Sequence, residues 1–370
     1  MNRVKRTVKQ VLFAAIASSA FVAAASFAQD WQAGAGDNWR KLMEAARKEG
    51  KVIVAGDVAP IADTLPAAFK RDTGIDMELV IGRTNELATR LDREARSGNV
   101  TVDVYFGGGT EIRLAQEGLL VAIKPQLLLP GVTGAKNWVD GKMRWFDKTE
   151  QFMFQGSNWV FGWPIANPKL VNAKSFTTWK DLLKPEFKGK IAAYDPRGGG
   201  PGQAAAAYLA EIYGIDFVKQ LFVGQQVTYT RDNRQLGEWI ARGTHAVGLG
   251  SIAAIVELYK SQGVDIAVPT LADGPGSLLG GFSVTKQPKG APHSAAASVF
   301  HNWYASRPGQ EVFAKGMLEP STRVDVKVAG MPDYIIPKGG LKYLNQYDED
   351  WYVKTRPKLA NAVLEALGGR

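Results

Sequence analysis

Arginines and glycine-rich loops that directly follow short apolar runs are the residues of this sequence best suited to bind a small anion. Arg83 and Arg231 each follow such a run, and a guanidinium group can hold a carboxylate or phosphonate through two parallel hydrogen bonds. The loops at 107–110 and 195–202 are rich in glycine, so their backbone N–H groups can approach a ligand. A helix that starts in such a loop favours an anion by about 0.3–1 kcal/mol per exposed contact.

The same residues also have a plainer interpretation. Glycine runs form ordinary turns between strands and helices, with Pro201 at a first helical position, and an exposed arginine often forms a surface salt bridge. Neither run fits the dinucleotide-binding pattern, and no phosphate-loop lysine motif is found. With both interpretations open, the candidate ligand-binding residues are Asp57, Arg83, Thr84, Asn85, Gly108, Gly109, Thr110, Trp159, Arg197, Gly199, Gly200, Arg231, Asn233 and Ser251.

Aromatic residues suggest a second feature of the site. Trp159, Phe161 and Trp163 alternate along an expected strand, so their side chains would share one face. On a cleft, that face would stack on an organic ligand or hold an ammonium by cation–π attraction; in a core it would simply pack. Asp57 and Glu86 would suit an amine, which extends the prediction to a zwitterion.

Catalysis finds little support. The chain has three histidines, His245, His293 and His301, and no cysteine. None of the histidines lies in a metal-binding spacing or near a nucleophile elbow. We therefore expect a binding protein rather than an enzyme, with no cofactor and no metal.

The elements that would position these residues alternate between short β-branched runs and amphipathic helices, which predicts βαβ units and a mostly parallel sheet. In a first block, strands are expected at 51–55, 77–81 and 102–106, with helices at 37–49, 65–71, 86–96 and 112–116. In a second block, strands are expected at 190–194, 226–230, 246–249 and 265–268, with helices at 203–213, 236–240 and 252–261. Aromatic stretches at 145–154 and 159–163 read as strands between the blocks.

The late segment, a strand at 279–284 and a helix at 293–306, is too small to fold alone and is expected to complete the first sheet. The prediction is therefore an α/β fold with two α/β domains joined by crossing strands and a ligand cleft between them. Lobe one would comprise 29–156 and 277–325, and lobe two 157–276. The segment 326–370, with a helix at 356–367, is left without an assigned lobe. In open α/β sheets, ligands bind beyond the carboxyl ends of the strands, which is where the candidate loops lie.

The first 28 residues have the layout of a secretory signal peptide. Arg3, Lys5, Arg6 and Lys9 precede an apolar run at 11–25, and small residues before Gln29 offer a cleavage site. A membrane anchor is the alternative. Since the formal net charge is +9 and these four cations would be removed, the mature chain keeps a mild +5, without a basic run of the kind that tracks nucleic acid. We expect a soluble, periplasmic protein without disulfides.

The mature chain resembles the periplasmic solute-binding proteins of ABC importers, and within them the two-lobed type II group that includes ferric-iron, polyamine and phosphonate binders. The resemblance rests on WRKLMEAARKEG at 39–50, FKRDTGI at 69–75, WKDLL at 179–183, FKGKI at 187–191, GFSV at 281–284 and the segment 297–313. It implies a bilobal fold that closes on a solute and presents it to a membrane permease.

The resemblance also suggests what the ligand is not. Ferric-iron members carry adjacent tyrosines after the strand that here ends in Gly248 and Leu249, whereas this chain has GSIAA at 250–254. We therefore expect capture of a small organic anion or zwitterion, of carboxylate or phosphonate type, by a monomer whose partners are this solute and an inner-membrane ABC permease, not nucleic acid. A ferric-iron or metal-chelate binder and an exported α/β enzyme are the alternatives.

Overall fold

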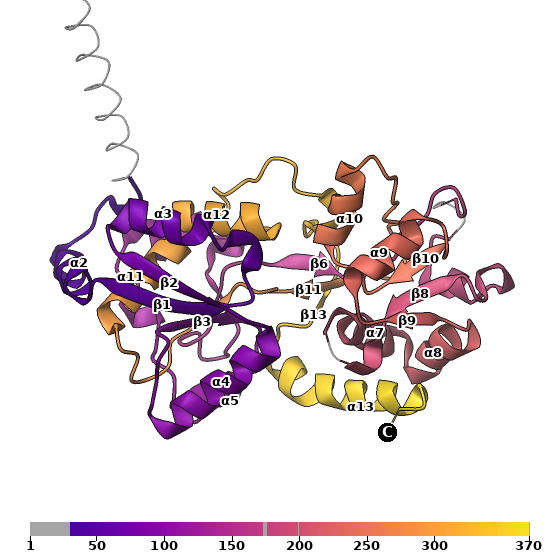
Figure 1. Cartoon of the computed structure of the whole chain (residues 1–370), viewed down its shortest axis with the longest axis horizontal. Coiled ribbons are helices and arrows are strands. Elements are labelled where there is room, and N and C mark those ends of the chain that lie inside the picture. The colour runs from indigo at the N-terminus through magenta and orange to yellow at the C-terminus, as the bar shows by residue number, and fades with distance from the viewer. Residues whose placement is uncertain (1–29, 173–175, 199, 370) are drawn as a thin grey trace, which may run out of the picture.

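The computed structural model describes residues 30–172, 176–198 and 200–369. The predicted signal peptide lies outside these ranges. Two groups of helices and strands lie side by side, joined in the middle by a small sheet (Figure 1). Each group is built on its own sheet, here called lobe one and lobe two, and the chain passes from lobe one to lobe two and back.

Lobe one has a six-stranded sheet in the order β2-β1-β3-β12-β5-β4. Its strands are β1 (Lys51–Gly56), β2 (Asp76–Ile81), β3 (Val104–Gly107), β4 (Arg144–Trp145), β5 (Phe154–Gln155) and β12 (Val284–Lys286). Strands β1, β2 and β3 are parallel, and β12 returns antiparallel to β3. The late segment therefore does complete the first sheet, but the single strand expected at 279–284 is wrong: residues 280–283 are not in a strand, and β12 begins at Val284.

Helices cover both faces of this sheet because its strand residues are apolar on both sides. Val52 and Val54 face one core, with α2 (Asp37–Glu49), α3 (Thr64–Thr73), α11 (Ser294–Ala305) and α12 (Arg307–Met317). Ala55 and Tyr105 face the other, with α4 (Thr84–Ser97) and α5 (Ile112–Gln116). The short helix α6 (Pro130–Thr133) precedes β4.

Lobe two has a four-stranded sheet in the order β7-β10-β8-β9. The strands are β7 (Ile165–Ala166), β8 (Ile191–Tyr194), β9 (Thr228–Thr230) and β10 (Val247–Leu249), and the helices are α7 (Gly200–Tyr213), α8 (Ile215–Lys219), α9 (Asn233–Ala241) and α10 (Ala253–Ser261). The strand expected at 265–268 is wrong: Ala267 forms only an isolated bridge to Ala166, because this stretch passes the sheet edge at a single point.

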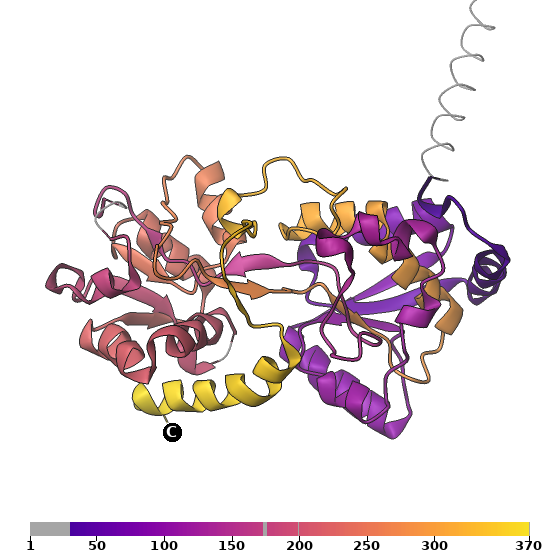
Figure 2. The ribbon, with the colours of Figure 1, turned by 180° about the vertical axis from the view of Figure 1, so that it is seen from behind.

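A third sheet, here called the crossing sheet, joins the lobes. It has the order β13-β11-β6, from β6 (Trp159–Phe161), β11 (Ser277–Leu279) and β13 (Leu344–Asn345). After β13 the chain forms a π-helical turn (Trp351–Thr355) and α13 (Arg356–Ala366), which packs on α7 and α8. Figures 1 and 2 both show α13, in yellow, running along lobe two. The C-terminal helix therefore contacts lobe two, while the domain boundaries stay a prediction.

Candidate functional site

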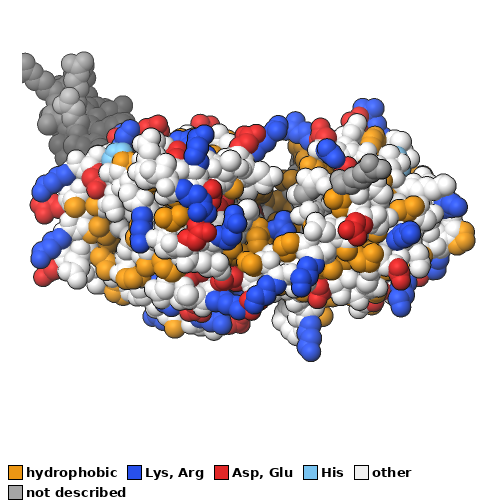
Figure 3. Space-filling view, turned by 90° about the horizontal axis from the view of Figure 1, so that it is seen from below, with side chains coloured by type: hydrophobic (Ala, Val, Ile, Leu, Met, Phe, Trp, Pro, Cys, Tyr) orange, Lys and Arg blue, Asp and Glu red, His pale blue; other side chains and the backbone are white. Residues whose placement is uncertain are grey.

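A cavity of about 400 Å³ lies where the two lobes and the crossing sheet meet, a size typical of small-molecule sites. Figure 3 shows the surface hollowed between the lobes, with Lys and Arg side chains around the opening. Eight of the fourteen predicted residues line this cleft: Asp57, Arg83, Thr84, Asn85, Gly108, Thr110, Trp159 and Gly200.

The lobe-one wall is made by residues just beyond the carboxyl ends of β1, β2 and β3. Arg83 precedes α4, and its side chain does not cap the helix. The first N–H groups of α4 therefore remain available as hydrogen-bond donors. Arg83 is exposed and has no ion pair among the described residues. Asp57 accepts one hydrogen bond, from the Thr84 hydroxyl at 3.2 Å. A cation, free helical N–H groups and one carboxylate therefore face the cleft together.

A buried ion pair between Lys286 and Glu111 supports the lobe-one side of the cleft. Lys286 is fully buried, and its ammonium donates to the Gly108 carbonyl at 2.8 Å and to Glu111 at 2.6 Å. This ammonium fixes the loop that follows β3, because it binds both the backbone of the loop at Gly108 and the side chain of Glu111. Gly109 does not line the cleft. A Cβ atom there would lie 2.0 Å from the Phe146 ring, so this glycine is required for packing.

The lobe-two wall is the beginning of α7, where Gly200 and Pro201 line the cleft. Gly202 explains why glycines are needed here: a Cβ atom would lie 2.3 Å from the Tyr194 carbonyl oxygen, so α7 starts tightly against the end of β8. The cleft is thus bounded by the N-terminal ends of two 14-residue helices, α4 and α7, which favour an anion between them. Gly199 lies outside the described residues.

Two of the arginines predicted to bind the ligand form ion pairs within lobe two instead. Arg197 and Arg231 both bind Asp195, at 2.8 and 3.2 Å, and Arg197 also lies over the Tyr229 ring. Burial acts to raise the pKa of Asp195, but hydrogen bonds from Arg197 and Arg231 and the charge of Arg197 outweigh it and lower that pKa. Neither arginine lines the cleft.

Asn233 and Ser251 do not line the cleft either, although both lie close to strand ends as expected. Ser251 is buried, and its hydroxyl, like the Asn233 side-chain oxygen, has no hydrogen-bond partner among the described residues. The neighbouring Ile252 reaches the lining instead.

Trp159 and Phe161 line the cleft, but Trp163 does not. The alternation ends because β6 stops at Phe161 and Gly162 has a φ of 94°. The Trp163 indole then donates to the Val160 carbonyl and packs on Tyr334. The indole N–H of Trp159 is buried without a partner among the described residues, although other atoms of this residue line the cleft.

The C-terminal segment, defined as residues 344–366, supplies part of the cleft that the sequence analysis missed. Its lining residues are Gln346, Tyr347, Tyr352 and Arg356. The Tyr352 and Thr110 hydroxyls are 3.1 Å apart, a contact between residues 242 positions apart in the chain. No local pattern reveals such a pairing; the available signal is the group of two tyrosines just before the last helix and the arginine that begins it.

A buried carboxyl lies where the crossing strands leave lobe one. Glu319 accepts hydrogen bonds from the Ser157 hydroxyl at 2.6 Å and the Phe282 N–H at 3.2 Å, so it touches both connections. Burial raises its pKa to about 7, although these two hydrogen bonds act in the opposite direction. Gly281, which lines the cleft, has a φ of 55°, and a Cβ atom there would lie 2.2 Å from the carboxylate.

Comparison with known proteins identifies the family. A family model for bacterial extracellular solute-binding proteins matches residues 51–316. The chain belongs to this family. An uncharacterized protein of Haemophilus influenzae is 25% identical over 277 residues, covering 72% of this chain and 76% of that protein.

Solved periplasmic binding proteins share the fold of this solute-binding protein. AfuA from Actinobacillus pleuropneumoniae, with fructose-6-phosphate bound, is 20% identical and has a TM-score of 0.61, with 86% of this chain and 98% of AfuA covered. Iron-bound HitA from Pseudomonas aeruginosa is 18% identical, with a TM-score of 0.61 and coverages of 85% and 99%. The spermidine/putrescine-binding protein PotD from Streptococcus pneumoniae is 16% identical, with a TM-score of 0.65 and coverages of 86% and 98%. The predicted two-lobed type II α/β fold is confirmed.

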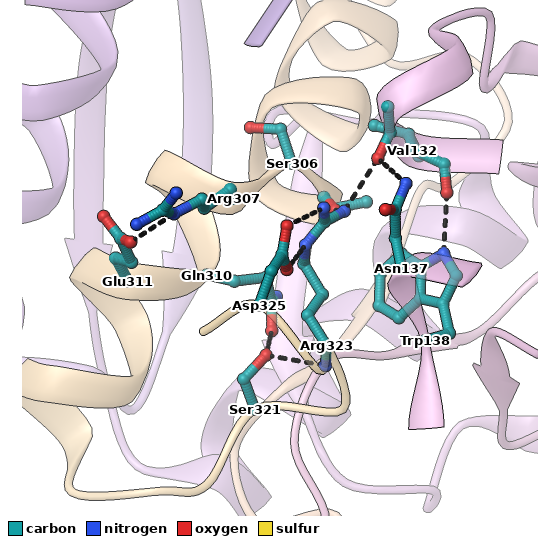
Figure 4. Close-up of polar contacts among 12 residues, drawn as sticks. Val132, Asn137, Trp138, Ser306, Arg307, Gln310, Glu311, Ser321, Arg323 and Asp325 are labelled. Carbon is teal, nitrogen blue, oxygen red and sulfur yellow. Dashed lines mark hydrogen bonds and ion pairs between the residues drawn. The ribbon is translucent and has the colours of Figure 1, made fainter. Parts of the chain in front are cut away.

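Further features of the solute-binding protein fit a structural role. Arg323, a buried arginine of lobe one, pairs with Asp325, donates to the Gly131 and Ala305 carbonyls and lies over Trp138 (Figure 4).

Within the described ranges, no three His, Cys, Asp or Glu side chains gather where they could hold a metal ion. None of the helices in these ranges has the length and apolar character needed to span a bilayer.

Proposed function

We propose that this solute-binding protein captures a small organic anion or zwitterion, of carboxylate or phosphonate type, and delivers it to an inner-membrane ABC permease. The observation that carries the proposal is Arg83, which has no ion pair among the described residues and lies beside the start of α4, facing the start of α7 across one cavity. Export through a signal peptide at residues 1–28 and action as a monomer are parts of the same proposal.

Closure of the lobes is the mechanism that these contacts support. An anion that binds only lobe one gains the Arg83 and α4 contacts, whereas closure adds the N–H groups of α7. Since a ligand shifts a conformational equilibrium by its difference in affinity for the two states, the α7 contacts would drive closure. The permease would then recognise the closed, loaded form.

A ferric-iron or metal-chelate binder is the second candidate. Asp57, Tyr347 and Tyr352 all line the cleft, and phenolate and carboxylate oxygens suit a hard cation. Against this, the Tyr347 hydroxyl donates to the Gly281 carbonyl at 2.9 Å. Burial also raises the pKa of Tyr347, which disfavours the phenolate that iron would need.

A thermal-shift panel on the mature chain, starting at Gln29, separates these candidates. It would contain carboxylates, phosphonates, sugar phosphates, polyamines and ferric citrate. A ligand at 100 times its Kd raises the free energy of unfolding by about 2.7 kcal/mol, which is readily seen. Stabilisation by one class of organic anion supports the proposal. Stabilisation by ferric citrate alone, while citrate has no effect, would refute it.

A further inference from the structure

The C-terminal segment connects the two lobes across the cleft. On the lobe-one side, Glu349 accepts hydrogen bonds from the Gln116 side chain at 2.8 Å and from the Lys148 backbone N–H at 2.7 Å. Tyr347 and Tyr352 both pack edge-on against Phe146. The segment then continues into α13, which packs on α7 and α8 of lobe two. The segment is therefore a wall of the cleft anchored on both sides.

Arg356, the first residue of α13, brings a second guanidinium to this wall. Its guanidinium lies 4.4 Å from the centre of the Tyr352 ring, and it donates one long hydrogen bond, of 3.4 Å, to the Gln203 side chain. None of the described carboxylates forms an ion pair with it. Most of its five N–H donors are therefore available to a ligand, whereas Arg197 and Arg231 share Asp195.

The charged groups on the lining now define a pattern. Among the described residues that line the cleft, Arg83 and Arg356 are the cations and Asp57 is the carboxylate. Arg83 belongs to lobe one, and Arg356 begins the helix that packs on lobe two. The rings of Trp159 and Phe161 form apolar lining on the crossing sheet. The cleft therefore offers two separate guanidinium groups together with an apolar surface.

We propose that Arg356 is a ligand-binding residue and that the solute carries two anionic groups, one bound by Arg83 and the other by Arg356. This inference rests on the proposed function, since it assigns the substrate class of the same cleft. A ligand with two anionic groups engages a cation on each side, so both ends of the molecule contribute to closure. An apolar spacer between them suits Trp159 and Phe161, and an amino group on that spacer suits Asp57.

Calorimetric titration of the mature chain tests this with matched probes. Straight-chain dicarboxylates of four to eight carbons, their 2-amino derivatives and phosphonocarboxylates are compared with monocarboxylates and monophosphonates of the same carbon number. We expect at least one probe with two anionic groups to bind about tenfold or more tightly than its matched monoanion. Arg356→Gln should remove most of that preference and leave the monoanion within about threefold.

Controls separate charge from structure. Arg242→Gln removes an exposed lobe-two cation that pairs with Glu238, so it should leave all affinities within about twofold. Arg356→Lys keeps the charge and should retain part of the preference, and unchanged thermal unfolding of the ligand-free variants shows that they fold. If no anion of any kind binds the wild type, the proposed function is overturned. If monoanions bind as tightly as dianions, or if Arg356→Gln behaves like Arg242→Gln, only the present inference is overturned.

Discussion

Replacing the buried Glu319 by glutamine should change how the stability of the protein depends on pH. The pKa of this carboxyl is about 7 in the fold, against 4.5 for an ordinary glutamate, because it is buried. The folded state therefore binds the proton more tightly than the unfolded chain does. In the wild type, this contribution to the free energy of unfolding is fully present below about pH 4.5 and is lost as the pH rises through 7. The difference corresponds to about 3 kcal/mol, most of it between pH 5 and 8.

Urea unfolding of the wild type and of Glu319→Gln at pH 5 and pH 8 measures this directly. Any pH-independent cost of the amide cancels when each protein is compared with itself at the two pH values. The wild type should lose about 2–3 kcal/mol more than the variant between pH 5 and 8. The exposed Glu186→Gln is the control and should follow the wild type. Parallel pH profiles for wild type and Glu319→Gln would show that this carboxyl is already ionised in the fold, and the reasoning would fail.

Three further predictions concern the cleft and the residues that support it. Arg83→Ala should weaken binding of the anion found in the panel about tenfold or more, as measured by calorimetry. Arg231→Ala is the control and should change this affinity less than twofold, because the Arg231 ion pair lies outside the cleft. Equal effects of the two substitutions would contradict the assignment of Arg83 to the site. Gly281→Ala should lower the free energy of unfolding, measured in urea, by about 2 kcal/mol or more, because Gly281 has a positive φ and lies close to the Glu319 carboxylate. An unchanged free energy of unfolding would mean that the loop relaxes freely. Lys286→Met should lower the free energy of unfolding by about 3–5 kcal/mol, because it leaves the Glu111 carboxylate buried without its partner. Removing both charges together should recover part of this loss. No recovery would show that the ion pair is not the cause.

Much of the fold could be predicted because local patterns specify it. The expected helix at 112–116 is α5 (Ile112–Gln116), and most other helices and strands shift by only a few residues at their ends. The aromatic stretch at 145–154 is an exception, because only its two ends lie in strands, β4 and β5. The strand at 265–268 fails because an apolar β-branched run does not reveal whether a partner strand lies along its whole length. Ala267 meets β7 at only one residue. Strand formation here depends on tertiary pairing that the sequence pattern does not contain.

The site could be predicted on lobe one and only in part on lobe two. The carboxyl ends of parallel strands share one sheet edge, so Asp57, Thr84 and Gly108 meet without further information. Arg231 also follows a strand, but its side chain turns to Asp195 within its own lobe. The direction of a long side chain depends on which carboxylates fold beside it. The residues of the C-terminal segment were missed because their contacts, such as that of Tyr352 with Thr110, join distant parts of the chain.

Ion pairing separates the structural arginines of this protein from its candidate ligand-binding ones. Arg231 and Arg323 are each bound to an aspartate, and a solute anion there would meet the repulsion of that carboxylate. Arg83 and Arg356 have no such partner among the described residues and line the cavity, so an anion gains their attraction without that cost. Because one belongs to lobe one and the other begins a helix packed on lobe two, the uncompensated positive charge is divided across the cleft. Under the proposal, a solute that bridges the two would couple recognition to closure of the lobes.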